Sequence, residues 1–192
     1  MKICATPGTA RKESILEAAI HVFSHFGYKK ASMDDVAEAA GISKQGLYLH
    51  FSGKEELFLA ANRKYLDDGL RLVDDALSQE KTGLFERICN AIDAWFGRHF
   101  ETFAPKVLDI IETGRRLSQN DIDKYKKAFC SRIAKALQTS TEFSRSKNIG
   151  SPDEVAEVLF TCGLSWKETH QSRAAFMKKM ATCAKVCCQI ED

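Results

Sequence analysis

Residues 32–58 decide the fold, and they read SMDDVAEAAGISKQGLYLHFSGKEELF. Two Ser-x-x-acid patterns, Ser32 with Asp35 and Ser52 with Glu55, are typical of capping boxes at helix starts. The first pattern predicts a short helix, and the second predicts the start of a long one. The segment between them is short enough for only one further helix, so three helices follow each other closely here.

The turn at residues 40–42 fits a helix-turn-helix. Gly41 tolerates the positive φ that such a turn needs, and Ala37 is small enough for the next helix to cross closely. Apolar side chains that would seal the pair are Val36, Ile42 and Leu47. The second short helix, predicted from its cap Ser43 to about Phe51, would then present polar groups outward: Lys44, Gln45, Tyr48 and His50.

The rest of the chain also predicts helices, because apolar residues recur at helical spacing and alternation typical of strands is absent. Upstream, a helix is expected over residues 10–26, with the stripe Ile15, Ala19, Val22 and Phe26. Downstream, Thr82 is the expected cap of another helix, Ser151-Pro152-Asp153-Glu154 opens a later one, and residues 139–150 are an expected loop. The fold class predicted is all-α with about nine helices: a helix-turn-helix domain at residues 1–56 and a helical body at 57–192.

Composition places the chain among ordinary globular proteins. It has 192 residues, 44% hydrophobic and 28% charged, with a formal net charge of +2. These values exclude a disordered or low-complexity chain. No apolar stretch reaches the roughly 20 residues that span a bilayer, and no export signal stands at the amino terminus, so a cytoplasmic location without membrane insertion is expected.

Catalytic and cofactor motifs are missing. The chain has no G-x-S-x-G, no H-E-x-x-H and no phosphate-binding loop, so we expect no enzyme, no cofactor and no metal. Seven cysteines without a C-x-x-C pair indicate free thiols in a reducing compartment.

The order of residues 32–58 resembles the TetR family of bacterial transcriptional regulators. The matching positions are Ser32, Ala37, Gly41, Ser43, Leu47, Tyr48, His50, Phe51, Lys54, Glu55 and Leu57. Upstream, the stretch ILEAAIHVFSHFGYKKAS also matches the first helix of that family, so the resemblance covers roughly residues 11–65. It implies a DNA-binding head whose third helix enters the major groove, and a symmetric dimer that binds an inverted repeat.

The resemblance also implies roles for individual residues. Contacts to the DNA backbone are expected from Ser32, Tyr48, His50 and Lys54, with Ser43 at the start of the third helix. Gln45 is the expected reader of adenine, and Lys44 reaches guanine or a phosphate. Gly46 departs from the family's frequent Thr, Ser or Ala, which removes a side chain that could contact a thymine methyl group.

Charge is nearly balanced in the expected head. Residues 1–50 hold six basic and five acidic side chains, so the acidic ones are expected to face away from DNA: Glu13, Glu17, Asp34, Asp35 and Glu38. A three-helix bundle without a DNA role is the alternative.

Aromatic residues spread over the carboxyl-terminal two thirds form either a core or, as the resemblance implies, a pocket for a small and largely apolar effector. The expected lining is Tyr65, Trp95, Phe96, Phe100, Leu108, Ile111, Phe129, Ile133, Phe160 and Trp166.

The last two helices are expected to pair across a two-fold axis. The expected interface residues are Val155, Leu159, Cys162, Phe176, Met180, Cys183 and Cys187. Cys183, Cys187 and Cys188 fit a core or interface better than thiol chemistry, because free cysteine behaves as a small buried hydrophobe.

These observations predict a repressor that is released from DNA by a small effector. Two alternatives stay open: a regulator gated by oxidation of Cys183, Cys187 and Cys188, and a helical small-molecule-binding protein or enzyme without DNA binding.

Overall fold

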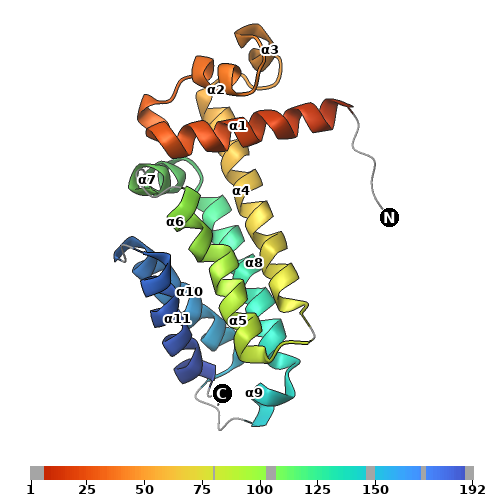
Figure 1. Cartoon of the computed structure of the whole chain (residues 1–192), viewed down its shortest axis with the longest axis vertical. Helices are drawn as coiled ribbons and strands as arrows, with labels where there is room; N and C mark the ends of the chain where they lie inside the picture. Colours follow the sequence, from red (N-terminus) through yellow and green to blue (C-terminus); the bar gives the residue numbers. More distant parts are fainter. Residues whose placement is uncertain (1–6, 80, 103–106, 146–149, 170–171, 189–192) are drawn as a thin grey trace. The chain divides into compact units, whose positions relative to one another are not determined.

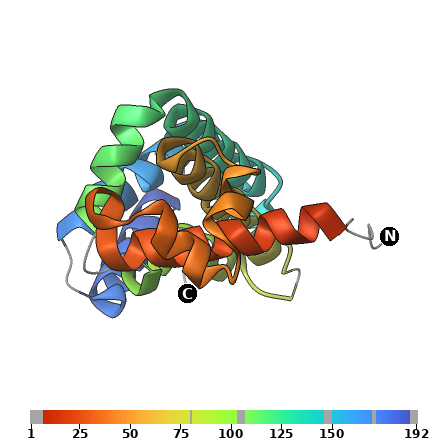
Figure 2. The same cartoon turned by 90° about the horizontal axis from the view of Figure 1, so that it is seen from above.

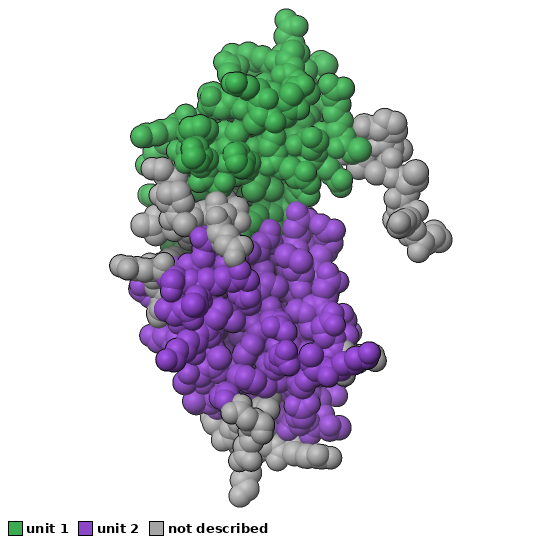
Figure 3. Space-filling model, viewed as in Figure 1, with its two compact units in different colours: residues 1–66, 102–119 green, residues 67–101, 120–192 purple. Residues whose placement is uncertain are grey.

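The computed structural model describes residues 7–79, 81–102, 107–145, 150–169 and 172–188, and within these every regular element is a helix (Figure 1). The predicted all-α fold class is confirmed. The chain divides into two compact units (Figure 3): unit 1 comprises residues 1–66 and 102–119, and unit 2 comprises residues 67–101 and 120–192. In the described part, no helix combines the length and the apolar character needed to cross a bilayer.

Unit 1 holds the helix-turn-helix. Its helices are α1 (Pro7–Lys30), α2 (Met33–Ala39), α3 (Lys44–Tyr48), the first half of α4 (Lys54–Leu77) and α7 (Val107–Leu117). Helix α1 packs against both α2 and α7, and Figures 1 and 2 show it crossing α4. Their contacts enclose one apolar core, in which Val36, Leu47 and Leu57 have no exposed surface.

The predicted apolar stripe of the first helix is confirmed for Ile15, Ala19 and Val22, which are all buried. It is wrong for Phe26, whose side chain is 43% exposed. Phe26 lies directly before Gly27, where a positive φ of 78° breaks the regular geometry of α1, and its ring packs edge-on against His25. Phe23 occupies the buried face instead, edge-on to Phe58 with ring centroids 5.2 Å apart.

The predicted caps are local hydrogen bonds, and most are confirmed. The Asp35 amide donates to Ser32 Oγ, while the Ser32 amide and hydroxyl donate to the Asp35 carboxylate. The expected pairing of Ser52 with Glu55 is wrong by one residue: the amide and hydroxyl of Ser52 both donate to Glu56, each at 2.7 Å. The reason is that α4 begins at Lys54, so Glu56 holds its third position.

Unit 2 contains the second half of α4 and most of the remaining helices. These are α5 (Leu84–Ile92), the π-helical turn η1 (Asp93–Gly97), α6 (Arg98–Thr102), α8 (Gln119–Gln138), α9 (Thr141–Arg145), α10 (Pro152–Thr169) and α11 (Arg173–Cys188). Helix α11 packs against α5 and α10. The expected cap at Ser151 is confirmed, since the Glu154 carboxylate accepts from the Ser151 amide at 2.8 Å.

Two expectations for this unit are wrong, one for the start of α5 and one for residues 139–150. Thr82 does not cap α5, because its hydroxyl donates to the Gln79 carbonyl. The first amide of α5, at Leu84, donates instead to the Glu142 carboxylate, at 3.1 and 3.3 Å from its two oxygens. Glu142 lies on α9, a short helix within the stretch expected to be a loop. A partner 58 residues away therefore replaces the local cap.

Candidate nucleic-acid interface

The turn between α2 and α3 has the predicted geometry. Gly41 adopts a φ of 64°, a conformation that L side chains rarely adopt. The Ile42 amide donates to the Ala37 carbonyl at 3.0 Å and closes the turn. Ala37 and Leu47 are buried, so the two helices cross closely on their apolar sides. The helix-turn-helix prediction is confirmed.

Helix α3 presents a surface that the fold does not use. Lys44, Gln45 and Tyr48 are exposed and His50 is half-buried, whereas Leu47 faces the core. Ser43 caps the helix by accepting from the Gly46 amide at 3.0 Å. A Cβ added at Gly46 would meet Ser43 Oγ at 3.2 Å and otherwise only the edge of Ile42. The structure therefore places Lys44, Gln45 and Tyr48 on α3. His50 lies two residues beyond its end, so the predicted span of this helix to about Phe51 is too long.

Ser32 stands at the start of α2 but is already engaged. Its hydroxyl donates to Asp35 at 2.7 Å, and its bonds to the Asp35 side chain hold the pKa of that carboxyl below its usual value. The residue is exposed at a helix amino terminus, where backbone amides attract anions.

Lys54 is held by a residue that the sequence analysis missed. Its ammonium lies 4.6 Å from the centre of the Tyr28 ring and 3.3 Å from the Lys29 carbonyl oxygen. The Tyr28 ring in turn packs against Phe58, with centroids 4.9 Å apart. Tyr28 therefore orients a cation at the start of α4. The signal for Tyr28 in the sequence was the Phe26-Gly27-Tyr28 stretch, which matches the end of the first helix in the family pattern.

Lys44 is not free of acidic neighbours. Its Nζ lies 2.9 Å from the Asp34 carboxylate on α2, and this hydrogen bond raises the pKa of Lys44. Asp34 therefore lies beside the α3 surface. Both side chains are more than half exposed, so water screens the pair and its contribution to stability is small.

A second residue missed by the sequence analysis is Leu49. It follows the last residue of α3, and its side chain is 87% exposed. The family pattern has a variable position here, between Tyr48 and His50, so no motif drew attention to it.

The expected effector residues of unit 2 pack against one another. Phe96 is at the centre, with ring centroids 5.8 Å from Phe129, 5.5 Å from Phe160 and 6.1 Å from Phe176. Trp95 contacts Phe129 at 5.5 Å, and Phe100 contacts Phe176 at 5.3 Å. Ile133 is fully buried and Trp166 is half-buried, below the ammonium of Lys179 at 4.4 Å. The side chains of Leu108 and Ile111, on α7, lie outside the described residues.

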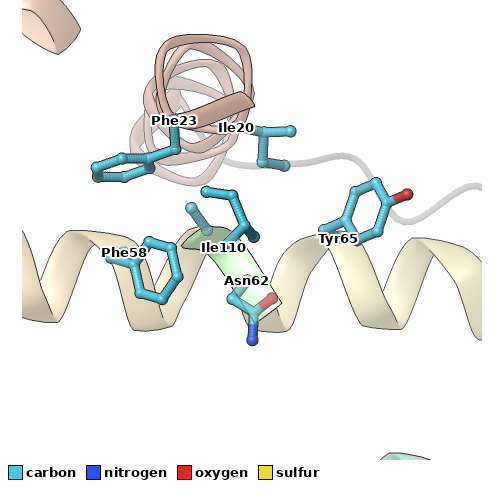
Figure 4. Close-up of a pocket in the computed structure, with 7 residues that line it drawn as sticks. Ile20, Phe23, Phe58, Asn62, Tyr65 and Ile110 are labelled. Carbon is cyan, nitrogen blue, oxygen red and sulfur yellow. The ribbon is translucent and has the colours of Figure 1, made fainter. Parts of the chain in front are cut away.

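Tyr65 belongs to a different place. It lines a small cavity in unit 1 together with Ile20, Phe23, Phe58 and Ile110 (Figure 4). The cavity has a volume of about 10 Å³, which is room for roughly one water molecule. It is too small for an organic effector as it stands.

Four of the residues expected at a two-fold interface are interior residues of this chain. Leu159, Phe176 and Met180 have no exposed surface, and Val155 is 5% exposed. They are corrected to core positions, because a side chain enclosed by its own protomer cannot contact a second one. Cys162, Cys183 and Cys187 are half-buried, and the sulfur atoms of Cys183 and Cys187 are 3.9 Å apart.

The environment of the cysteines favours packing over chemistry. Burial raises the pKa of the Cys89 and Cys130 thiols to about 11 and that of Cys188 to about 12. Burial and the neighbouring thiols also raise the pKa of Cys183. These thiols stay protonated near neutral pH, and the thiolate is the reactive form. In the described part, no three His, Cys, Asp or Glu side chains are grouped to hold a metal ion.

Comparison with known proteins gives the same assignment for the head. Residues 15–61 match the family model described as bacterial regulatory proteins, tetR family. The chain is 40% identical over 90 residues to the HTH-type transcriptional activator FasR of Mycolicibacterium smegmatis. The aligned region covers 47% of this chain and 41% of FasR. It is 32% identical over 133 residues to the uncharacterized HTH-type transcriptional regulator YfiR of Bacillus subtilis. This alignment covers 67% of this chain and 64% of YfiR.

The chain thus spans less than two thirds of the length of these relatives. The whole fold has counterparts as well. A TetR-like transcriptional regulator from Rhodococcus sp. RHA1 superposes with a TM-score of 0.62 and 23% identity, over 94% of this chain and 96% of that one. Residues 15–61 therefore match the helix-turn-helix segment of the tetR family of bacterial regulatory proteins, and the chain shares its helical fold with a TetR-like regulator.

Proposed function

We propose that the chain is a DNA-binding transcriptional regulator, a homodimer that binds an inverted-repeat operator and acts as a repressor released by a small, largely apolar effector. The observation that supports this most is the surface of α3. Lys44, Gln45 and Tyr48 are exposed on a helix whose opposite side is buried through Leu47, so none of the three fills the core.

The charges around α3 fit contacts to DNA. Tyr48 and His50 have hydrogen-bonding groups suited to the backbone, and Lys54 supplies a cation that Tyr28 and Lys29 hold in place. Gln45 is exposed and has the amide that pairs with adenine through two atoms. This division between positioning and base contact is typical of helix-turn-helix proteins.

Dimerisation would place two such helices about 34–36 Å apart, one turn of DNA. The exposed faces of α10 and α11 are the proposed two-fold contact, and they include Val158 and Val186, which are 46% and 62% exposed. An effector that fits only a different spacing of the two heads would weaken DNA binding, by a coupling of typically 1–3 kcal/mol.

The test begins with selection of genomic fragments by the purified protein at two salt concentrations, with and without reductant. Enrichment of an inverted repeat is the expected result, and transcription from that operator then distinguishes repression from activation. Loss of the enriched site only without reductant would favour thiol gating instead.

Substitutions in the head then test the assignment on the selected operator. Lys54→Ala should lower affinity for all sequences alike and reduce the slope of log K against log salt by about 1. Tyr48→Ala should also weaken binding. Lys127→Ala removes the same charge from an exposed position on α8 and should leave the slope unchanged. Unaltered affinity and salt dependence in both head variants would refute the proposed function.

A further inference from the structure

Leu49 is the most exposed large apolar side chain in the part of the chain that the structure describes. The next most exposed aliphatic side chains are Val186 at 62% and Leu72 at 47%. A single exposed leucine is ordinary on most surfaces. This one stands at the end of α3, where the neighbouring exposed residues are those proposed to contact DNA.

Backbone geometry places Leu49 on the same face as Gln45. The Leu49 amide donates to the Gln45 carbonyl at 3.2 Å, and Leu49 has helical dihedral angles, so the helical path continues through it. Residues four apart lie one above the other on a helix. Leu47, between them, points into the core with no exposed surface. This face of the helix therefore carries the side-chain amide of Gln45 and, one turn further along, the isobutyl side chain of Leu49.

We propose that Leu49 is a specificity-determining residue that contacts the C5 methyl group of a thymine in the major groove, next to the base pair that Gln45 reads. The inference rests on the proposed function. Thymine is the base that offers an apolar group in the major groove, and a leucine side chain has no hydrogen-bonding group with which to read any other base.

Spacing supports the pairing of the two contacts. Four residues advance a helix by about 6 Å, which is less than two base-pair steps of about 3.4 Å. Gly46, on the turn between, has no side chain to offer a methyl contact of its own, and the space beside it is open apart from Ser43. Leu49 thus supplies the apolar contact that position 46 lacks.

The test removes only the methyl group. Each thymine of the selected operator is replaced in turn by uracil, symmetrically in both half-sites, and affinity is measured by fluorescence anisotropy. The wild-type protein should bind one such duplex about fourfold more weakly per half-site, the value of one buried methyl group. Leu49→Ala should bind the thymine and uracil duplexes equally at that position, with its salt dependence unchanged.

Leu72→Ala is the matched control, since it truncates an exposed leucine of unit 2 and should retain the thymine preference of the wild type. The inference is overturned if the wild type discriminates at no thymine, or if Leu49→Ala keeps the discrimination. Either result leaves salt-sensitive operator binding intact, and so differs from failure of the proposed function, in which no duplex is bound in that way.

Discussion

At the scale of single residues, the head combines groups that attract DNA with one that opposes it. Lys44 on α3 is hydrogen-bonded to the Asp34 carboxylate at 2.9 Å, in a pair that water reaches from both sides. A phosphate that approaches Lys44 must therefore compete with a carboxylate already in place. In the proposed function, this ion pair would limit sequence-independent attraction to DNA, because that attraction grows with every unpaired cation.

Asp34→Asn should strengthen binding to unrelated DNA and steepen the slope of log K against log salt by up to about 1, because it frees Lys44 for a phosphate. Titrations of operator and unrelated duplexes at several salt concentrations measure both effects. Glu38→Gln removes the same charge from an exposed site on the same helix and is the control. Equal effects of the two variants would mean that net charge matters and the Lys44 contact does not.

Among the helices of unit 2, the close approach of α10 to η1 depends on a glycine in α10, Gly163. A Cβ added at Gly163 of α10 would lie 2.5 Å from Cε2 of Phe96, on η1. The Phe96 ring cannot give way easily, since Phe129, Phe160 and Phe176 surround it. Gly163 is therefore required by packing, although glycine weakens a helix.

Gly163→Ala should destabilise the protein by about 1–3 kcal/mol through overpacking. Gly114→Ala, in α7, makes the same change where the added Cβ meets only the Asn62 side-chain nitrogen, at 3.9 Å. It should stabilise by about 0.5–1 kcal/mol, because alanine is the better helix former. Urea unfolding measures the change in the free energy of unfolding for each variant. If both substitutions lowered it, the contact with Phe96 would not be the cause of the destabilisation.

At the scale of the whole molecule, one histidine links stability to pH. Burial lowers the pKa of His99 well below its ordinary value, and the charges of Lys167 and Arg98 add to this effect. The folded protein therefore keeps the ring neutral at a pH where the unfolded chain binds a proton. Stability from this site is fully present above the unfolded pKa of about 6.5 and is lost as the pH falls toward the folded pKa.

Unfolding followed between pH 7.5 and pH 5 should show a decline in the free energy of unfolding that His99→Gln makes shallower. The residue at 99 then no longer titrates, so the difference between folded and unfolded proton binding disappears. His21→Gln, at an exposed position on α1, should keep the decline of the wild type. An equal pH dependence in the His99 variant would assign the decline to other groups.

Local sequence patterns were sufficient to predict the all-helical class and the position of the helix-turn-helix, but not α9, which lies in an expected loop. The caps at Ser32, Ser43 and Ser151 and the turn at Gly41 could be predicted because each depends on residues within four positions. The exposed residues of α3 followed from the same local periodicity. The error at Ser52, displaced by one residue, is the size that such local reasoning allows.

Contacts between distant residues depend on how the helices pack in the folded chain. Three such contacts join residues 26 to 80 positions apart. Lys54 lies over the Tyr28 ring, and the Glu142 carboxylate accepts from the first amide of α5. On α7, which belongs to unit 1, Asp109 accepts from the Lys29 amide at 3.4 Å. No pattern in the chain specifies such pairs, because they arise when helices pack and polar groups near them find whichever partner lies within reach.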